Sequence, residues 1–126
     1  MKYIERKIIV LIVILLSVVG LKAQSISYIE ITKNWYYIYD ESGKKFKTFS
    51  TNIGELKGYS SSIFVVQNGS WIYVYDAKGN KIKTMSESSA GKVLSVTGDT
   101  FTTQLGSWIY TWSKDGKKIS TRYKQK

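Results

Sequence analysis

The chain has 126 residues, with 19 basic and 9 acidic side chains, and it contains no cysteine, histidine or proline. Without cysteine and histidine, thiol nucleophiles, the usual zinc and haem ligands and the commonest general base are excluded. A glycosidase needs two carboxylates that face one bond, and the spacing of the acidic residues indicates no such pair. We therefore expect a protein that is not an enzyme and that has no metal or other cofactor.

Residues 1–23 have the three parts of a secretory signal peptide. Basic residues begin the segment, an apolar run follows over 8–19, and the small residue Ala23 precedes Gln24. The apolar run is shorter than the roughly 20 residues that a membrane-spanning helix needs. We expect cleavage near Ala23 and Gln24 and a secreted or periplasmic protein. Membrane attachment through an uncleaved segment is the alternative.

The predicted exported part, 24–126, is long enough for one small domain but not for two. Loss of the signal peptide leaves a net charge of +7. Since there is no disulfide, the stability of this domain has to come from packing of apolar and aromatic side chains.

Three segments of this domain share one pattern, and they span 35–48, 71–84 and 108–121. Each begins with tryptophan and continues with aromatic residues at every second position, the period that places side chains on one face of a β-strand. An Asp or Ser follows, then a glycine three residues later, which is typical of a hairpin turn. Aliphatic residues fill most of the intervening positions, so we expect these strands to be buried on both faces.

The alternation of apolar and polar residues between turn residues predicts β-strands throughout the exported part. There are eleven of them, at 27–32, 35–39, 45–50, 55–59, 63–67, 71–75, 81–86, 92–96, 100–104, 108–112 and 118–123.

The strands divide into three tandem repeats of about 36 residues, which span approximately 27–59, 60–96 and 97–126. About four antiparallel strands per repeat predict an all-β fold of propeller-blade-like units. Three blades are fewer than a closed propeller normally has, so a compact β-trefoil and an open meander remain as alternatives, and two chains could together supply six blades. A four-stranded blade would run over 55–59, 63–67, 71–75 and 81–86, and the unit ahead of such a blade lacks its leading strand.

The tandem units resemble a group of small secreted proteins of Gram-negative bacteria that are built from Gly-Ser-Trp-Ile-Tyr-x-Tyr-Asp-x-x-Gly-Lys-Lys-Ile repeats. The resemblance covers the whole exported part and implies the repeated β architecture. It implies no activity and no functional residues. A looser similarity to the YD repeats of bacterial surface and toxin proteins reflects the same hairpin chemistry.

The repeated aromatic and basic positions are the candidate binding residues. Tryptophan and tyrosine combine a large apolar area with a polar tip, so they form either the core or a recognition surface. The three tryptophans begin their strands beside loops and are expected to reach the surface, with lysines near each turn. The candidate residues are Trp35, Trp71, Trp108, Tyr73, Tyr110, Lys45, Lys81 and Lys118.

These residues favour an exported interaction module of the bacterial envelope. The first hypothesis is a protein-binding module, such as an inhibitor or immunity-type protein with an acidic partner. The second is a glycan-binding module that uses the repeated tryptophan and tyrosine positions, and the third is a structural envelope protein that associates with its own copies. Nucleic acid is disfavoured as a partner, because the exported part has a single arginine, Arg122.

Overall fold

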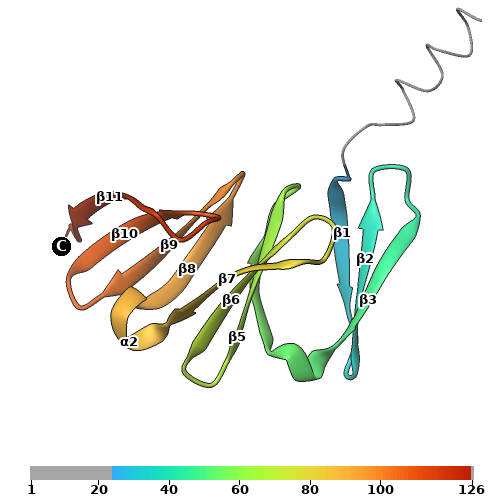
Figure 1. Cartoon of the computed structure of the whole chain (residues 1–126), viewed down its shortest axis with the longest axis horizontal. Coiled ribbons are helices and arrows are strands. Elements are labelled where there is room, and N and C mark those ends of the chain that lie inside the picture. The colour runs from blue at the N-terminus through green and yellow to red at the C-terminus, as the bar shows by residue number, and fades with distance from the viewer. Residues whose placement is uncertain (1–23, 126) are drawn as a thin grey trace, which may run out of the picture.

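The computed structural model describes residues 24–125, which form an all-β structure of eleven strands in three antiparallel sheets. Figure 1 shows the sheets side by side. The predicted signal peptide lies outside the described residues. Within 24–125, no helix has the length and apolar character that crossing a bilayer requires.

Each sheet follows the order of the chain, because every strand pairs with the next one through a hairpin. The first sheet contains β1 (Ile26–Ile31), β2 (Trp35–Asp40) and β3 (Lys45–Ser50). The middle sheet contains β4 (Glu55–Tyr59), β5 (Ile63–Asn68), β6 (Trp71–Asp76) and β7 (Lys81–Ser86). The third sheet contains β8 (Lys92–Thr97), β9 (Thr100–Leu105), β10 (Trp108–Ser113) and β11 (Lys118–Tyr123). The eleven predicted strands are confirmed to within one residue at either end.

Two short helical segments connect the sheets, η1 (Thr51–Ile53) and α2 (Glu87–Ala90). Ser50 and Ser86 precede them, and each side chain accepts a hydrogen bond from a backbone N–H two residues later. Such a serine cap satisfies one of the donors that the start of a helix leaves free. Neither segment is predictable from the sequence, since three or four residues are too few to show a helical period.

The turn between β2 and β3 is built around Asp40. Its Oδ1 accepts hydrogen bonds from the backbone N–H groups of Ser42 and Lys44, both at 3.0 Å. Asp76 accepts the same two bonds in its own turn, at 2.9 Å. The turn glycines all have a positive φ of 82–88°, at Gly43, Gly79 and Gly116. The predicted turn chemistry is therefore confirmed.

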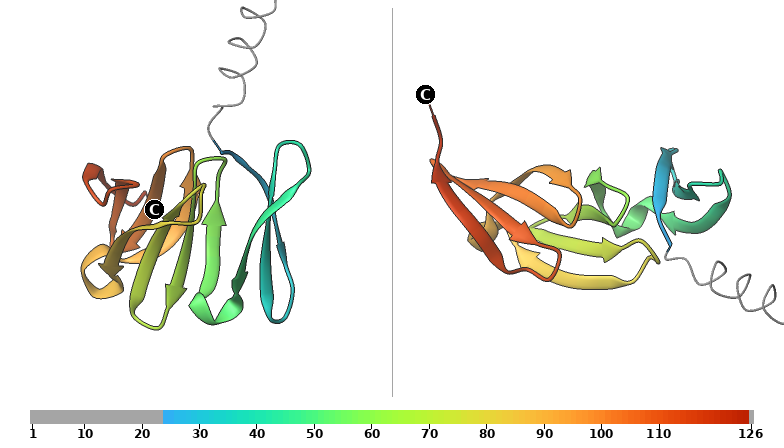
Figure 2. Two further views of the ribbon diagram at one scale, coloured as in Figure 1. Left: turned by 45° about the vertical axis from the view of Figure 1, so that its right-hand side comes forward. Right: turned by 90° about the horizontal axis from the view of Figure 1, so that it is seen from above.

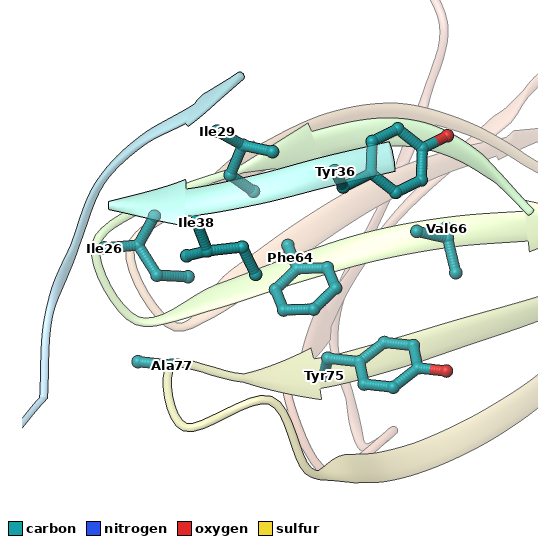
Figure 3. Close-up of a cluster of buried hydrophobic side chains, with 8 residues drawn as sticks. All are labelled: Ile26, Ile29, Tyr36, Ile38, Phe64, Val66, Tyr75 and Ala77. Atoms are coloured by element: carbon teal, nitrogen blue, oxygen red, sulfur yellow. The ribbon is translucent and has the colours of Figure 1, made fainter. Parts of the chain in front are cut away.

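The middle sheet is covered on both faces, and Figure 2 shows it between the other two sheets from two further directions. One face packs against the first sheet, where the rings of Phe64 and Tyr75 stack with their centres 4.8 Å apart (Figure 3). The ring of Phe49 packs against both of them. The other face packs Val65 and Val74 against the third sheet. Burial on both faces is thus confirmed for the middle sheet. The prediction is wrong for the first and third sheets, because each has only one neighbouring sheet within 24–125.

The strand registers define equivalent positions in the three sheets. Aliphatic or threonine pairs occupy the same place: Ile38 with Ile29, Val74 with Val65, and Thr111 with Thr102. On its other edge β5 pairs with β4, and β9 pairs with β8, whereas β1 has no further partner strand within the described residues. The first sheet therefore has three strands, as expected for the unit ahead of a blade over 55–86. The repeat bounds 27–59 placed β4 with the first sheet, but β4 pairs with β5 in the middle sheet.

Candidate functional site

The three strand-opening tryptophans occupy one place in the three sheets. They are Trp35, Trp71 and Trp108, which begin β2, β6 and β10 just after a hairpin turn. Each tryptophan is paired with the last residue of the following strand. These turns lie at the same end of the three sheets, the lower end in Figure 1. We call these three residues the tryptophan row.

A repeated backbone contact fixes the base of each tryptophan. The residue that follows the third strand of each hairpin set donates its N–H to the carbonyl in the turn just before the tryptophan. The bonds are Thr51 N to Asn34 O at 3.0 Å, Glu87 N to Ser70 O at 2.9 Å, and Lys124 N to Ser107 O at 2.7 Å. The turn is thereby tied to the start of the next segment, so the main chain of each tryptophan is held in place.

The tryptophan side chains of the row are open to solvent. Trp35, Trp71 and Trp108 are 46%, 51% and 46% exposed, as their position beside loops predicts. Serines are the cross-strand neighbours of Trp35 and Trp71, while the ring of Tyr123 packs edge-on against Trp108 with the ring centres 5.2 Å apart. By contrast Trp112 is buried, and its indole N–H donates to Thr103 Oγ1 at 2.9 Å.

The predicted lysines lie over tyrosine rings of the same sheet. Lys45 Nζ is 4.5 Å from the ring centre of Tyr37. Lys81 lies 4.4 Å from the ring of Tyr73, and Lys118 lies 4.0 Å from the ring of Tyr110. An ammonium group at this distance interacts favourably with the negative face of the ring. Each sheet therefore has one strand that begins with an exposed tryptophan and continues with a tyrosine whose ring a lysine covers.

The two predicted tyrosines are only partly available for binding. Tyr73 packs against the cluster between the first and middle sheets, and Tyr110 packs against the cluster between the middle and third sheets. Each tyrosine also has its lysine over the ring. The free aromatic surface of the predicted residues consequently belongs to the tryptophans.

The aromatic residues further along the strands differ between the sheets. Tyr75 and Trp112 are buried against the preceding sheet, and burial raises the pKa of the Tyr75 hydroxyl, with a smaller contribution from Tyr73. Their counterpart Tyr39 is half-buried on the outer face of the first sheet, where partial desolvation and Glu30 raise its pKa. This strand position is therefore core in the middle and third sheets and lies on the surface in the first.

That outer face holds two residues that sequence reasoning missed, Tyr28 and Glu30. The rings of Tyr28 and Tyr39 stack at 6.4 Å, and the Tyr39 hydroxyl donates to Glu30 Oε1 at 3.3 Å. The alternation of 27–32 placed both residues on one face of a strand. It carried no sign that the face would stay uncovered.

At the other end of the sheets, away from the tryptophan row, lies a shallow pocket of about 320 Å³. Its lining includes Asp76, Asp99, Lys78 and Lys114. The Asp76 carboxylate is already engaged in its turn. Within 24–125, no three potential metal-ligating side chains gather at one point.

A scan against protein-family models finds no match to the chain, and no curated protein matches it in sequence. The resemblance to the secreted tandem-repeat proteins remains a prediction.

Proposed function

We propose that the protein is an exported, non-catalytic binding module that holds a glycan chain along the tryptophan row. The observation that carries this proposal is the equivalent placement of three tryptophans, each 46–51% exposed. They follow turns that lie at one end of three adjacent sheets (Figure 1). A ligand made of identical units suits a surface made of identical positions.

The geometry sets the size of the ligand. Sheets that pack face to face lie about 10 Å apart, so a ligand that touches all three tryptophans has to be at least about 20 Å long. Each indole would stack on the apolar face of one sugar, and the lysines beside the tyrosines would interact with hydroxyl or acidic groups of the same chain. Occupying linked positions raises the overall affinity, because the second and third contacts are intramolecular.

The test is calorimetric titration with soluble envelope oligosaccharides of increasing length, including N-acetylglucosamine oligomers and peptidoglycan strands. Affinity is expected to rise with length until the chain spans the row. Trp35→Ala, Trp71→Ala and Trp108→Ala are each expected to weaken binding of the long ligand by roughly tenfold.

Tyr28→Ala is the matched control, because it removes an aromatic ring that is 54% exposed but lies outside the row. It is expected to leave glycan affinity unchanged. Absence of any length dependence, or an equal effect of the control, would contradict the proposal.

A protein partner is the second candidate, and the exposed strand β11 favours it. All six residues of β11 are exposed, including Ile119 at 58% and Tyr123 at 55%, and Lys118 and Arg122 give the strand a positive charge. Such a surface fits an acidic protein, as expected for an inhibitor or immunity-type role. A partner that binds here would be released by salt and by Arg122→Glu, whereas glycan binding at the row would not respond to Arg122→Glu.

The repeated registers support a further part of this proposal, that the three sheets are blade-like copies of one unit. Adjacent sheets contact each other in the same way, through an aliphatic face and an aromatic face. One copied unit gives three equivalent tryptophans without any separate adaptation of each site.

A further inference from the structure

The outer face of the third sheet differs from the equivalent face of the middle sheet. Val65 and Val74 are fully buried where the middle sheet packs against the third. The equivalent residues of the third sheet are Thr102 and Thr111, which are half-buried on a face that no other sheet covers within 24–125. The substitution of threonine for valine makes this end polar, although Ile109 on the same face remains buried.

One position is apolar in the first and middle sheets and charged in the third. Phe49, Met85 and Arg122 are equivalent, because they pair with Tyr36, Ile72 and Ile109 in their sheets. Phe49 packs its ring against the Phe64–Tyr75 pair of the next sheet, at 5.6 and 5.5 Å. Met85 likewise packs against the cluster that the middle sheet shares with the third. In the first and middle sheets this position therefore packs against the core that the sheet shares with the next one, and in the first sheet it contacts the aromatic pair directly.

The outer face of the first sheet carries the aromatic pair that has no such neighbour. Tyr28 and Tyr39 are paired in the register that Phe64 and Tyr75 occupy in the middle sheet. Within 24–125 no sheet covers them, and Tyr28 is 54% exposed. Beside them Glu30 stands where the middle sheet has the buried Val66, and its carboxylate accepts the hydrogen bond from Tyr39.

The two ends are complementary in chemistry. At the internal junction a phenylalanine meets the rings of a phenylalanine and a tyrosine, with a valine beside them. At the free ends an arginine, Arg122, is available for two tyrosines with a glutamate beside them. A guanidinium group stacks on aromatic faces and pairs with a carboxylate, so it satisfies both partners at once.

We propose that a second copy of the chain packs its third sheet on the first sheet, head to tail, with Arg122 against Tyr28 and Tyr39 and beside Glu30. This contact repeats the internal arrangement of the sheets with polar residues in place of apolar ones. It goes beyond the proposed glycan binding, since it uses the end faces and not the tryptophan row.

Because the two ends differ, the contact is heterologous, and a heterologous contact either closes into a ring or continues as a filament. Two copies supply six sheets, a number within the usual range of about four to eight for closed propellers. The assembly expected is therefore a closed pair in which both ends of both chains are occupied.

Charge reversal tests the contact. The mass of the purified protein is measured by sedimentation equilibrium over a range of concentrations, and twice the chain mass is expected. Glu30→Arg and Arg122→Glu are each expected to weaken association by roughly tenfold or more. The double variant carries both reversed charges and restores the pair, so its association is expected to return toward that of the original protein.

Matched controls keep the change in net charge constant. Glu55→Arg repeats the first change on β4, and Lys124→Glu closely repeats the second one beyond the end of β11. Both are expected to leave association unchanged. Single reversals of exposed residues should also leave the circular dichroism spectrum unchanged, which separates lost association from lost folding.

Three results would overturn the proposal. The first is a monomer at all concentrations up to about 1 mM, which corresponds to association weaker than about 4 kcal/mol. The second is a pair that is insensitive to both reversals or is not restored in the double variant. The third is a series of larger assemblies, which would contradict the closed pair. A glycan titration of the Glu30→Arg variant then reports separately on the tryptophan row.

Discussion

Two glycines, Gly54 and Gly91, determine how the chain leaves each connecting segment and enters the next sheet. Their φ angles are 134° and 97°, a region that other residues rarely adopt. A Cβ at Gly54 would lie 2.7 Å from the backbone oxygen of Gln67, and one at Gly91 would lie 2.5 Å from that of Gln104. Neither carbonyl can move without breaking its strand pairing.

We predict that Gly54→Ala and Gly91→Ala each lower the free energy of unfolding by about 2–4 kcal/mol, through backbone strain and steric overlap. Urea denaturation followed by fluorescence measures the change. Gly69→Ala is the control, because Gly69 has a φ of 61° but nothing within 4 Å of an added Cβ. Its cost should be only about 1 kcal/mol. Equal costs at the three positions would contradict this explanation.

Thr103 is the polar residue at the centre of the cluster between the middle and third sheets. Its hydroxyl donates to the carbonyl of Ala90 and accepts from the Trp112 indole, and the residue is fully buried. Thr103→Val would leave both partners without a hydrogen bond. We predict a loss of about 1–3 kcal/mol in the free energy of unfolding, measured by urea denaturation.

Thr102→Val is the control for this change. Thr102 lies next in the strand but on the outer face, where its hydroxyl bonds Ser95 in an exposed position. Its stability should stay within about 0.5 kcal/mol of the original protein.

Protonation of the Asp40 carboxyl makes the stability of the protein depend on pH. The Ser42 hydroxyl and the backbone N–H of Lys44 hold the pKa of the Asp40 carboxyl below its usual range. A carboxyl whose pKa is lower in the folded state stabilises the fold above the unfolded pKa of about 3.9, and this stabilisation disappears as pH falls through the folded pKa. We predict that Asp40→Ala destabilises the protein at pH 7 and that its urea midpoint converges with that of the original protein in acid. A constant difference across this pH range would contradict the prediction.

Residue chemistry that depends on neighbours along the chain could be predicted from the sequence. Asp40 and Gly43 in a turn, and Trp35 beside a loop, follow from local spacing. Tyr28 and Glu30 could not be identified as a surface, because the same alternation in the middle sheet yields the buried residues Phe64 and Val66. Their exposure is decided by which sheet is the neighbour.

At the scale of the strands, the difference between an internal face and an end face rests on single substitutions. Val74 is fully buried against the third sheet, whereas its counterpart Thr111 is half-buried on the uncovered face. A hydroxyl buried without a partner is costly, so Val74→Thr should lower the free energy of unfolding by about 1–3 kcal/mol.

The reverse substitution, Thr111→Val, is expected to change the free energy of unfolding by no more than about 0.5 kcal/mol. Urea denaturation of the two variants gives the comparison. Similar losses in both would indicate that the two faces do not differ in burial.

Strand positions were predictable because the period of two and the turn residues agree in every hairpin. The helical segments η1 and α2 were not, since a single turn carries no periodic signal. The face of a sheet that becomes core was also not predictable, because both faces of β2, β6 and β10 are rich in apolar residues.

For the whole molecule, the sequence predicted eleven strands, an all-β fold and units of about four strands, and the structure shows sheets of three, four and four strands. It also shows that the middle sheet is covered on both sides. That arrangement depends on contacts between residues far apart in the chain, such as Phe49 with Phe64 and Tyr75. Within 24–125 the two end faces and the tryptophan row stay uncovered by other sheets.

The most direct test of the binding proposal is to follow the four indole N–H signals in a ¹⁵N-resolved NMR spectrum during titration with a long envelope oligosaccharide. Trp112 serves as an internal reference, because its N–H is buried and bonded to Thr103. The signals of Trp35, Trp71 and Trp108 are expected to shift together and with one affinity, while that of Trp112 stays in place. If the three exposed indoles do not respond, or if only one of them does, the tryptophan row is not a glycan-binding surface.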